Sequence, residues 1–544
     1  MFATLLKPKK STTIRDNIVG QDILINGPFG TRKMMYADYV ASGRAYAPIE
    51  TALQKHIMPL YANTHTEASR TGRQTTAFRE QSRKIIATAI GATQDDAVIF
   101  CGTGCTGAID KFINILGLKV TKGAERHNID FSVNAKDRPI VFIGPFEHHS
   151  NDVQWRETIA EVITIKECPD GGLDLKDLEA QLIKYKDRPL KIGSFSAASN
   201  VTGIICDTAP VAKILHKYGA LAAFDCAASA PYLPINMNEG GDAYMDAVFI
   251  STHKLLGGPG TPGILAFKKK WAQNKTPVIP GGGTVSYVSP CAQAYLECVE
   301  HREEGGTPDI VGAIRAGLSF DLRNQTGIEG IKDKEIKLAQ RAITRWGKNK
   351  NIKILGSNTA ERLPFFSFLI HSGEQYLHYN FVVALLNDMF GIQARGGCSC
   401  AGPYGHRLLD INLDVSREYE KIIADGVEIL KPGWIRVGFN YFYNEEDCEL
   451  LMRAIEWVAD HGAKLLPYYT YETQTGQWVH VDAKDDLLDL TALESLKTGR
   501  APHSIDALFA QADAFAISAS KLTPQKCCDI LNATPKHLHW FAHA

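Results

Sequence analysis

A lysine follows an apolar stretch at Ser251-Thr252-His253-Lys254, and a glycine-rich loop and a second apolar stretch come after it. This pattern predicts a strand, a short loop and another strand, with Lys254 at the end of the first strand. Lysine is seldom buried without a partner, and desolvation lowers its pKa and makes the amine nucleophilic. Such an amine forms Schiff bases with carbonyl compounds, including pyridoxal phosphate. Taken alone, the segment favours a lysine in a surface turn.

Other polar residues follow apolar runs upstream of Lys254. The run at 97–100 leads through a glycine-rich turn into a predicted helix, whose N-terminus is a ready phosphate site. The turn lacks the Gly-Lys-Ser/Thr ending of a P-loop, and a turn without a ligand fits the pattern as well. A carboxylate that ends an apolar strand, as Asp225 does, needs a cationic partner. The residues at these strand ends are Cys105, Thr106, His148, Asn200 and Asp225.

Strands alternate with helices over about residues 95–270, which predicts an α/β fold with a mostly parallel sheet covered on both faces. On such a sheet the strand ends converge on one edge. A helical stretch follows at 309–347, and a smaller α+β unit begins near residue 352. Its predicted strands lie near 365–370 and 434–438, and its predicted helices near 376–390, 416–430 and 445–460. We expect four parts: an N-terminal segment 1–45 packing with the small domain, a large domain 46–345, a small domain 346–469, and an extension 470–544 of unknown role.

Composition excludes several classes of protein. The chain has 544 residues, and its 59 Lys and Arg balance its 60 Asp and Glu, so no global field favours nucleic acid or an anionic membrane. No apolar run reaches the length that spans a bilayer, and the first residues lack the core of a signal peptide. The twelve scattered cysteines favour reduced thiols and a cytoplasmic protein. In the tail, the spacing of Cys527, Cys528, His537, His539 and His543 is not that of a zinc site, so no metal is expected.

The order of these motifs over about residues 35–462 resembles the class V, fold-type I family of pyridoxal-phosphate enzymes. The resemblance is strongest to the cysteine desulfurase and selenocysteine lyase branch. It implies a large domain with a seven-stranded, mostly parallel sheet, a smaller α+β domain, and a homodimer.

The resemblance also assigns cofactor roles. Lys254 would carry pyridoxal phosphate, and Asp225 would pair with the pyridine nitrogen and keep the ring an electron sink. His148 would stack on the ring as a catalytic residue, and Asn200 would face both cofactor and substrate. The phosphate positions implied by the resemblance are Cys105, Thr106, Ser251 and His253, with Thr307 reaching the phosphate across the dimer interface.

The segment Ala394-Arg395-Gly396-Gly397-Cys398-Ser399-Cys400 matches the Arg-x-Gly-x-x-Cys stretch of the desulfurases through Arg395 and Cys400. The resemblance implies that Lys254 removes the Cα proton of L-cysteine or L-selenocysteine and that the Cys400 thiolate takes the sulfur or selenium. Alanine leaves, and a sulfur-acceptor protein is a partner that the sequence leaves open. The implied substrate-binding residues are Arg436, whose guanidinium suits a carboxylate, with Asn200, Arg395 and His65. That Cys398 and Cys400 merely line the loop remains an open alternative.

Two positions depart from the family pattern. Ala228 stands where a glutamine is common, and Cys105-Thr106-Gly107 replaces Thr-Thr-Glu. Two other readings therefore stay open. One is another class V reaction on an amino-acid substrate, such as transamination, epimerisation or β-elimination, and the other is an inactive interaction protein.

Overall fold

The computed structural model describes residues 13–64, 66–120, 126–128, 133–484, 487–519, 521, 531 and 534–542. These residues form two compact units that alternate along the chain. The first unit comprises the described parts of 1–19, 40–334 and 359–363, and the second those of 20–39, 335–358 and 364–544.

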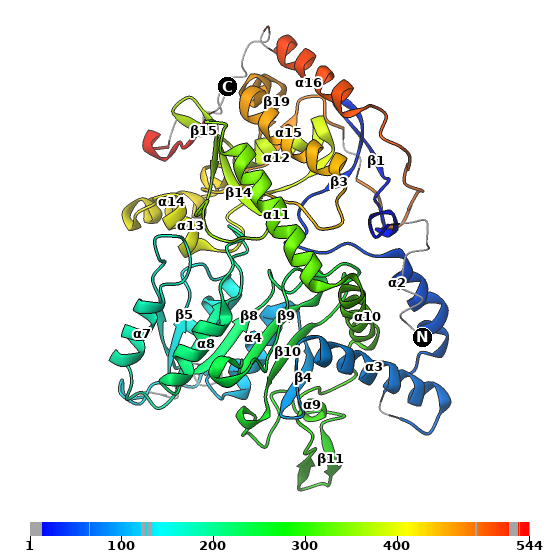
Figure 1. The fold of residues 1–544 in the computed structure, drawn as a ribbon, viewed down its shortest axis with the longest axis vertical. Helices are drawn as coiled ribbons and strands as arrows, with labels where there is room; N and C mark the ends of the chain where they lie inside the picture. The colour runs from blue at the N-terminus through cyan, green and yellow to red at the C-terminus, as the bar shows by residue number, and fades with distance from the viewer. Residues whose placement is uncertain are drawn as a thin grey trace. The chain divides into compact units, whose positions relative to one another are not determined.

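The first unit is built on a seven-stranded sheet, which Figure 1 shows surrounded by helices. Five neighbouring strands run parallel to one another. Strand β10 is antiparallel to both of its neighbours, so β4 runs in the same direction as the five parallel strands. The predicted mostly parallel, seven-stranded sheet is confirmed. In sheet order the strands are β4 (Asp96–Cys101), β10 (Gly263–Lys268), β9 (Ala247–Ser251), β8 (Leu221–Asp225), β7 (Lys191–Ser196), β5 (Ile140–Ile143) and β6 (Glu161–Thr164).

Helices cover this sheet because its strands are apolar on both faces. Val98 and Ile99 are adjacent in β4 and therefore point to opposite faces, yet both are buried. One face packs on α4 through Phe112, whose ring lies 5.7 Å from Phe249 and 5.8 Å from Phe267. The α-helices of this unit are α2 (Ala47–Ala52), α3 (Arg70–Ala89), α4 (Gly104–Ile115), α6 (Val153–Arg156), α7 (Leu175–Lys184), α8 (Thr208–Lys217), α9 (Val299–Arg302) and α10 (Ile310–Thr326). A hairpin of β11 (Val285–Val288) and β12 (Gln293–Tyr295) completes it.

The second unit contains a six-stranded sheet. Its strands are β17 (Arg395–Gly397), β18 (Trp434–Gly438), β14 (Phe365–Ser372), β15 (Gln375–Leu377) and β21 (Phe541–Ala542), with β13 (Ile352–Ile354) also paired to β14. Three two-stranded sheets accompany it: β1 (Leu24–Gly27) with β2 (Gly30–Lys33), β3 (Met35–Tyr36) with β16 (Ile392–Gln393), and β19 (Tyr469–Tyr471) with β20 (Trp478–His480). Its helices are α12 (Tyr379–Phe390), α13 (Gly402–Leu408), α14 (Leu413–Ala424), α15 (Glu445–His461) and α16 (Ile505–Ala519).

Several predicted elements differ in detail. The helical stretch at 309–347 is two helices, α10 and α11 (Ile328–Trp346), because Gly327 between them has a φ of 88°. The division between the two units falls inside α11. The tail, where no pattern was found, forms α16 and adds β21 to the six-stranded sheet parallel to β15.

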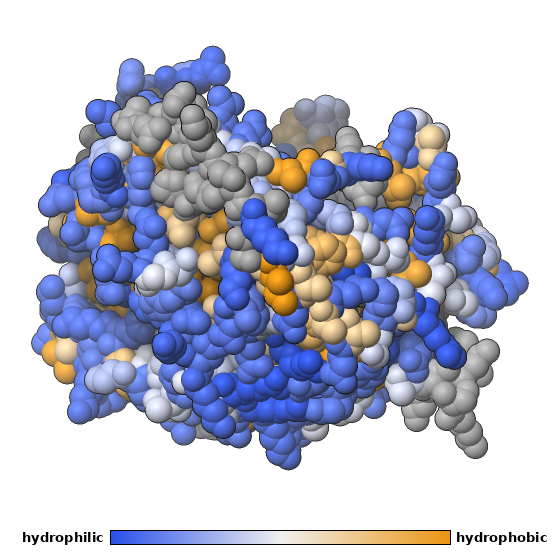
Figure 2. Space-filling view, turned by 90° about the horizontal axis from the view of Figure 1, so that it is seen from above, coloured by the Kyte–Doolittle hydropathy of each residue, from blue (hydrophilic) through white to orange (hydrophobic). Residues whose placement is uncertain are grey.

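In the space-filling view of Figure 2, hydrophilic residues predominate and hydrophobic residues stand in small groups between them. Within the described ranges, each helix is too short or too polar to cross a membrane.

Candidate active site

The predicted cofactor residues of the first unit stand where strands of the large sheet end. Asp225 is the last residue of β8 and Ser251 the last of β9. Lys254 lies in the 3-10 turn that follows β9. This convergence follows from the parallel arrangement, because the carboxyl ends of parallel strands meet at one edge.

The N-terminus of α4 is tied to the end of β9. The Cys105 backbone N–H donates to Ser251 Oγ over 2.9 Å. A Cβ on Gly104 would lie 2.7 Å from both Ser251 Oγ and His253 Cε1, and the φ of Gly104 is +56°. Only glycine therefore fits at this helix start, where free N–H groups and the helix dipole favour an anion.

Asp225 is a buried carboxylate, only 3% exposed. Its Oδ1 accepts a hydrogen bond from the Ala227 N–H over 2.8 Å. Burial raises the pKa of Asp225, while the Ala227 hydrogen bond, the Lys254 charge and a hydrogen bond from the Cys105 thiol oppose that rise. Burial, followed by the neighbouring Lys254 charge, lowers the pKa of His253 to about 4. A neutral imidazole beside Lys254 therefore prevails at neutral pH.

A second group of predicted residues is joined through Ser150. Ser150 Oγ lies 2.7 Å from Thr106 Oγ1 and 3.1 Å from His148 Nδ1. The Ser150 N–H also donates to His148 Nδ1 over 3.1 Å, which fixes that nitrogen as an acceptor. Ser150 was missed, although it follows the two histidines directly in the sequence.

The remaining predicted residues of this unit lie in turns. Asn200 is 7% exposed in the turn after β7, where Ser199 Oγ accepts hydrogen bonds from the N–H groups of Val201 and Thr202. Thr307 is exposed, and its hydroxyl accepts a hydrogen bond from Asn63 over 3.1 Å. His65 lies outside the described residues.

Two further residues, Gly43 and Glu147, hold the site in place and were not predicted from the sequence. The Gly43 N–H donates to the His253 carbonyl over 2.8 Å, and a Cβ on Gly43 would lie 2.0 Å from the Leu255 carbonyl oxygen. Glu147 accepts hydrogen bonds from Asn151 and Ser196, and burial raises its pKa to about 7. Its place before the two histidines was the available signal for Glu147.

In the second unit, Arg395 and Arg436 face each other across β17 and β18. Arg436 is 2% exposed and donates to Asp38 Oδ1 over 2.6 Å through Nη2 and 3.2 Å through Nε. The carboxylate offsets the repulsion that two opposed cations would create. Asp38 was not predicted, because an acidic residue within Tyr36-Ala37-Asp38-Tyr39 carries no motif of its own.

Cys398 and Cys400 lie in the turn that follows β17. Both are half-buried, whereas Ser399 between them is 5% exposed. Ser399 Oγ accepts a hydrogen bond from Trp434 Nε1 over 3.2 Å, which attaches the turn to β18.

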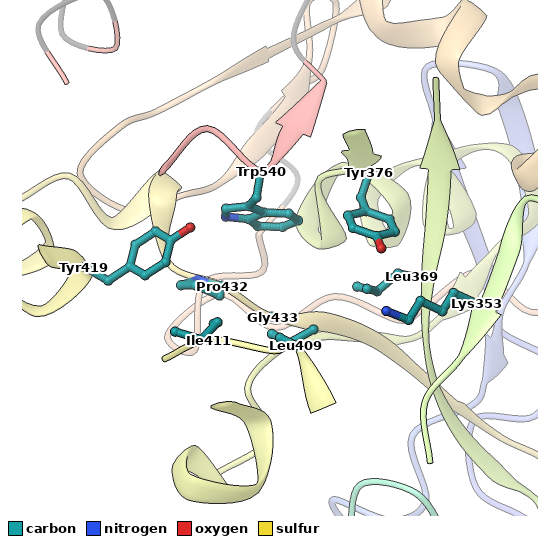
Figure 3. A pocket seen from close by; sticks show the side chains of 9 residues that line it. All are labelled: Lys353, Leu369, Tyr376, Leu409, Ile411, Tyr419, Pro432, Gly433 and Trp540. Carbon is teal, nitrogen blue, oxygen red and sulfur yellow. The ribbon is translucent and has the colours of Figure 1, made fainter. Parts of the chain in front are cut away.

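The C-terminal segment packs beside this part of the second unit. Trp540 stacks on Tyr379 with ring centroids 5.7 Å apart and an interplanar angle of 12°, and its Nε1 donates to the Leu430 carbonyl over 2.9 Å. A cavity of about 110 Å³ lies next to it. Figure 3 shows the lining side chains, with the Lys353 amine pointing inward: Lys353, Leu369, Tyr376, Leu409, Ile411, Tyr419, Pro432, Gly433 and Trp540.

The tail histidines make ordinary contacts. His537 pairs with Glu418 over 2.9 Å, and His539 lies 2.7 Å from the Thr534 hydroxyl. Within the ranges described above, His, Cys, Asp and Glu form no group of three or more that could hold a metal ion. Cys527, Cys528 and His543 lie outside those ranges.

Comparison with known proteins defines the class. The aminotransferase class-V family model matches residues 35–451, so the chain belongs to that family of pyridoxal-phosphate-dependent enzymes. A probable cysteine desulfurase of Halalkalibacterium halodurans is 29% identical over 374 residues, 68% of this chain and 84% of the relative. One of Streptomyces coelicolor is 27% identical over 376 residues, again 68% and 84%.

Solved structures show the same fold. A cysteine desulfurase from Thermococcus onnurineus matches with a TM-score of 0.64 at 24% identity, covering 78% of this chain and 95% of that one. One from Escherichia coli matches with a TM-score of 0.59 at 22% identity, covering 78% and 94%. The fold-type I architecture expected from the sequence is confirmed.

Proposed function

We propose that this protein is a pyridoxal-phosphate-dependent cysteine desulfurase that removes sulfur from L-cysteine, or selenium from L-selenocysteine, and releases L-alanine. The observation that carries the proposal is a thiol, Cys400, held in a tight turn five residues after Arg395 in a class V chain. The names of the related proteins support the same reaction.

The residues of the first unit fit the cofactor. The start of α4 at Gly104 and the Ser251 hydroxyl offer hydrogen-bond donors to a phosphate at a place that a Cβ would fill. Asp225 is a buried carboxylate of the kind that needs a cationic partner, and a protonated pyridine nitrogen supplies one. Lys254 interacts with Asp225 electrostatically, as an amine near that ring would.

We assign the roles as follows. Cys105, Thr106, Ser251 and His253 bind the phosphate, with Thr307 donated by a second subunit of a homodimer. His148 stacks on the cofactor ring. The Ser150 N–H donates to His148 Nδ1, which fixes the orientation of the imidazole. When bound, pyridoxal phosphate supplies an electron sink that acidifies the Cα proton of the amino acid.

On the substrate side, Arg436 binds the carboxylate, with Asp38 orienting the guanidinium. Asn200, Arg395 and His65 are further substrate-binding residues. The Lys254 amine removes the Cα proton and later returns a proton, since a lysine amine in its neutral form can act as a general base.

Cys400 then accepts the sulfur. Its thiolate attacks the substrate sulfur, a sulfur–sulfur bond forms, and the bond between that sulfur and Cβ breaks with its electron pair left on carbon. Protonation of the carbon gives alanine, and Cys400 holds a persulfide. We further propose that the protein acts in the cytoplasm and passes this sulfur to an acceptor protein.

A second candidate is another class V reaction on an amino acid, and one observation favours it. Ala228 is 5% exposed where the family often has a glutamine, so that contact to the cofactor is missing from this chain.

The test is to incubate cofactor-loaded protein with L-cysteine and a thiol reductant, and to quantify alanine and sulfide. We expect equal amounts of both, lost in Lys254→Ala, and lost in Cys400→Ala with the cofactor still bound. Alanine formation that survives Cys400→Ala, or a cofactor-loaded wild type that forms none, would favour the second candidate.

A further inference from the structure

Cys398 and Cys400 occupy two positions of a single tight turn. The Ala401 N–H donates to the Cys398 carbonyl over 3.3 Å, closing a four-residue turn. Its central residues, Ser399 and Cys400, have φ values of 52° and 57°. Positive φ at both central positions is the pattern of a type I′ turn, which normally uses glycine, asparagine or aspartate. Serine and cysteine at these positions cost about 1–2 kcal/mol of conformational free energy each, and such strain concentrates at functional sites.

The turn is anchored at alternate residues. Ser399 is bonded to the buried Trp434, and Ala401 is 0% exposed, whereas the two cysteines are half-buried. The packing therefore fixes the backbone at Ser399 and Ala401 but leaves both thiols partly accessible.

The turn brings the Cα atoms of the two cysteines close together. Two peptide units hold the Cα atoms of residues 398 and 400 to at most about 7.6 Å, and a turn shortens this separation. Sulfur–sulfur bonds form between cysteines with Cα atoms about 4.4–6.8 Å apart. The Cα separation of these residues is therefore compatible with the passage of one sulfur atom between them.

We propose that Cys398 is a second sulfur carrier, which takes the outer sulfur of a persulfide from Cys400. The inference rests on the proposed desulfurase function. The Cys398 thiolate attacks the outer sulfur and forms a new sulfur–sulfur bond, and the bond from that sulfur to Cys400 Sγ breaks. Cys400 leaves as a thiolate, so the exchange needs no oxidant or reductant. The freed Cys400 takes sulfur from a second substrate molecule.

The strand that leads to Cys398 lies beside Tyr379. A Cβ on Gly396 would lie 2.7 Å from Tyr379 Cδ2, so the Tyr379 ring packs directly on β17. Tyr379 in turn stacks on Trp540, in the C-terminal segment beyond the family match. The C-terminal segment therefore packs near the strand that leads into Cys398.

The test counts alanine in the first phase after cofactor-loaded protein meets excess L-cysteine without reductant. The wild type is expected to release about two equivalents per chain and Cys398→Ser about one, because each thiol stores one sulfur. Cys291→Ser is the matched control, since Cys291 is exposed in the β11–β12 hairpin and should leave the amplitude unchanged. Cofactor binding by Cys398→Ser checks that this variant is folded.

A second readout locates the sulfur itself and does not rely on counting alanine. Alkylation and peptide fragmentation locate the added sulfur, which should appear on both Cys398 and Cys400 in the wild type. Sulfur on Cys400 alone, or equal amplitudes for wild type and Cys398→Ser, would overturn the carrier role and leave the desulfurase proposal intact. A wild type that forms no alanine would overturn both.

Discussion

The Cys105 backbone N–H donates a hydrogen bond to Ser251 Oγ over 2.9 Å, joining the start of α4 to the strand that precedes Lys254. One hydroxyl thus organises the proposed phosphate site. Ser251→Ala should weaken pyridoxal-phosphate binding about tenfold, since a hydrogen bond contributes about 1–1.5 kcal/mol. Titration of the cofactor-free protein measures this, with the exposed Ser286→Ala as the control. Unchanged affinity in Ser251→Ala would remove this residue from the site.

Breaking the ion pair of Asp38 and Arg436 should lower the stability of the protein. Arg436 is 2% exposed, so Asp38→Asn leaves a buried guanidinium without its counter-charge. We expect the free energy of unfolding to fall by about 3 kcal/mol. Denaturant unfolding measures it beside Asp414→Asn, whose carboxylate is exposed and should change stability by less than about 0.5 kcal/mol. Equal denaturant midpoints for Asp38→Asn and Asp414→Asn would show that the buried ion pair does not stabilise the fold.

His378 predicts a pH dependence in the second unit. Its Nε2 donates to the Ile429 carbonyl and its Nδ1 accepts from the Asn380 N–H, so the ring is neutral. Burial lowers its pKa to about 3, so between pH 6.5 and pH 3 the unfolded state binds the additional proton. Stability from this group is therefore complete above about pH 6.5 and falls on acidification, by up to about 1.4 kcal/mol per pH unit. Between pH 7 and pH 4, the free energy of unfolding should depend less on pH in His378→Gln than in the wild type. The same pH dependence in both proteins would contradict this prediction.

Trp540 predicts the contribution of the C-terminal segment. It stacks on both Tyr379 and His378 and donates to the Leu430 carbonyl. Trp540→Ala should lower the free energy of unfolding by about 2–3 kcal/mol, less than for a fully buried tryptophan because Trp540 is half-buried. Hydrogen exchange at Tyr376, whose N–H donates to the Trp540 carbonyl, should become faster. Leu490→Ala, at a side chain that is 83% exposed, is the control and should have almost no effect.

Much of the large sheet could be predicted because several of its strands are continuous apolar runs, and some of these runs end at a polar residue. Val248 to Ile250 and Leu221 to Phe224 are buried throughout, as parallel strands covered on both faces require. The same regularity located Asp225, Ser251 and Lys254 on one edge. Gly43 and Ser150 were missed because their roles come from hydrogen bonds to His253 and His148, which no periodicity records.

The second unit was harder to predict because its pairings are short and join distant segments. Strand β21 has two residues and pairs with β15 more than 160 positions earlier in the chain. A two-residue strand carries no period, so only the packing of Trp540 and Phe541 reveals it. Asp38 is comparable, since its partner Arg436 lies almost 400 residues away.

The desulfurase reaction is tested most directly by mixing cofactor-loaded protein with one equivalent of L-cysteine and mapping its peptides by mass spectrometry. We expect alanine together with one added sulfur atom on the peptide that holds Cys398 and Cys400, and neither product in Cys400→Ser. Alanine without sulfur on that peptide, or no alanine from protein that holds its cofactor, would contradict it.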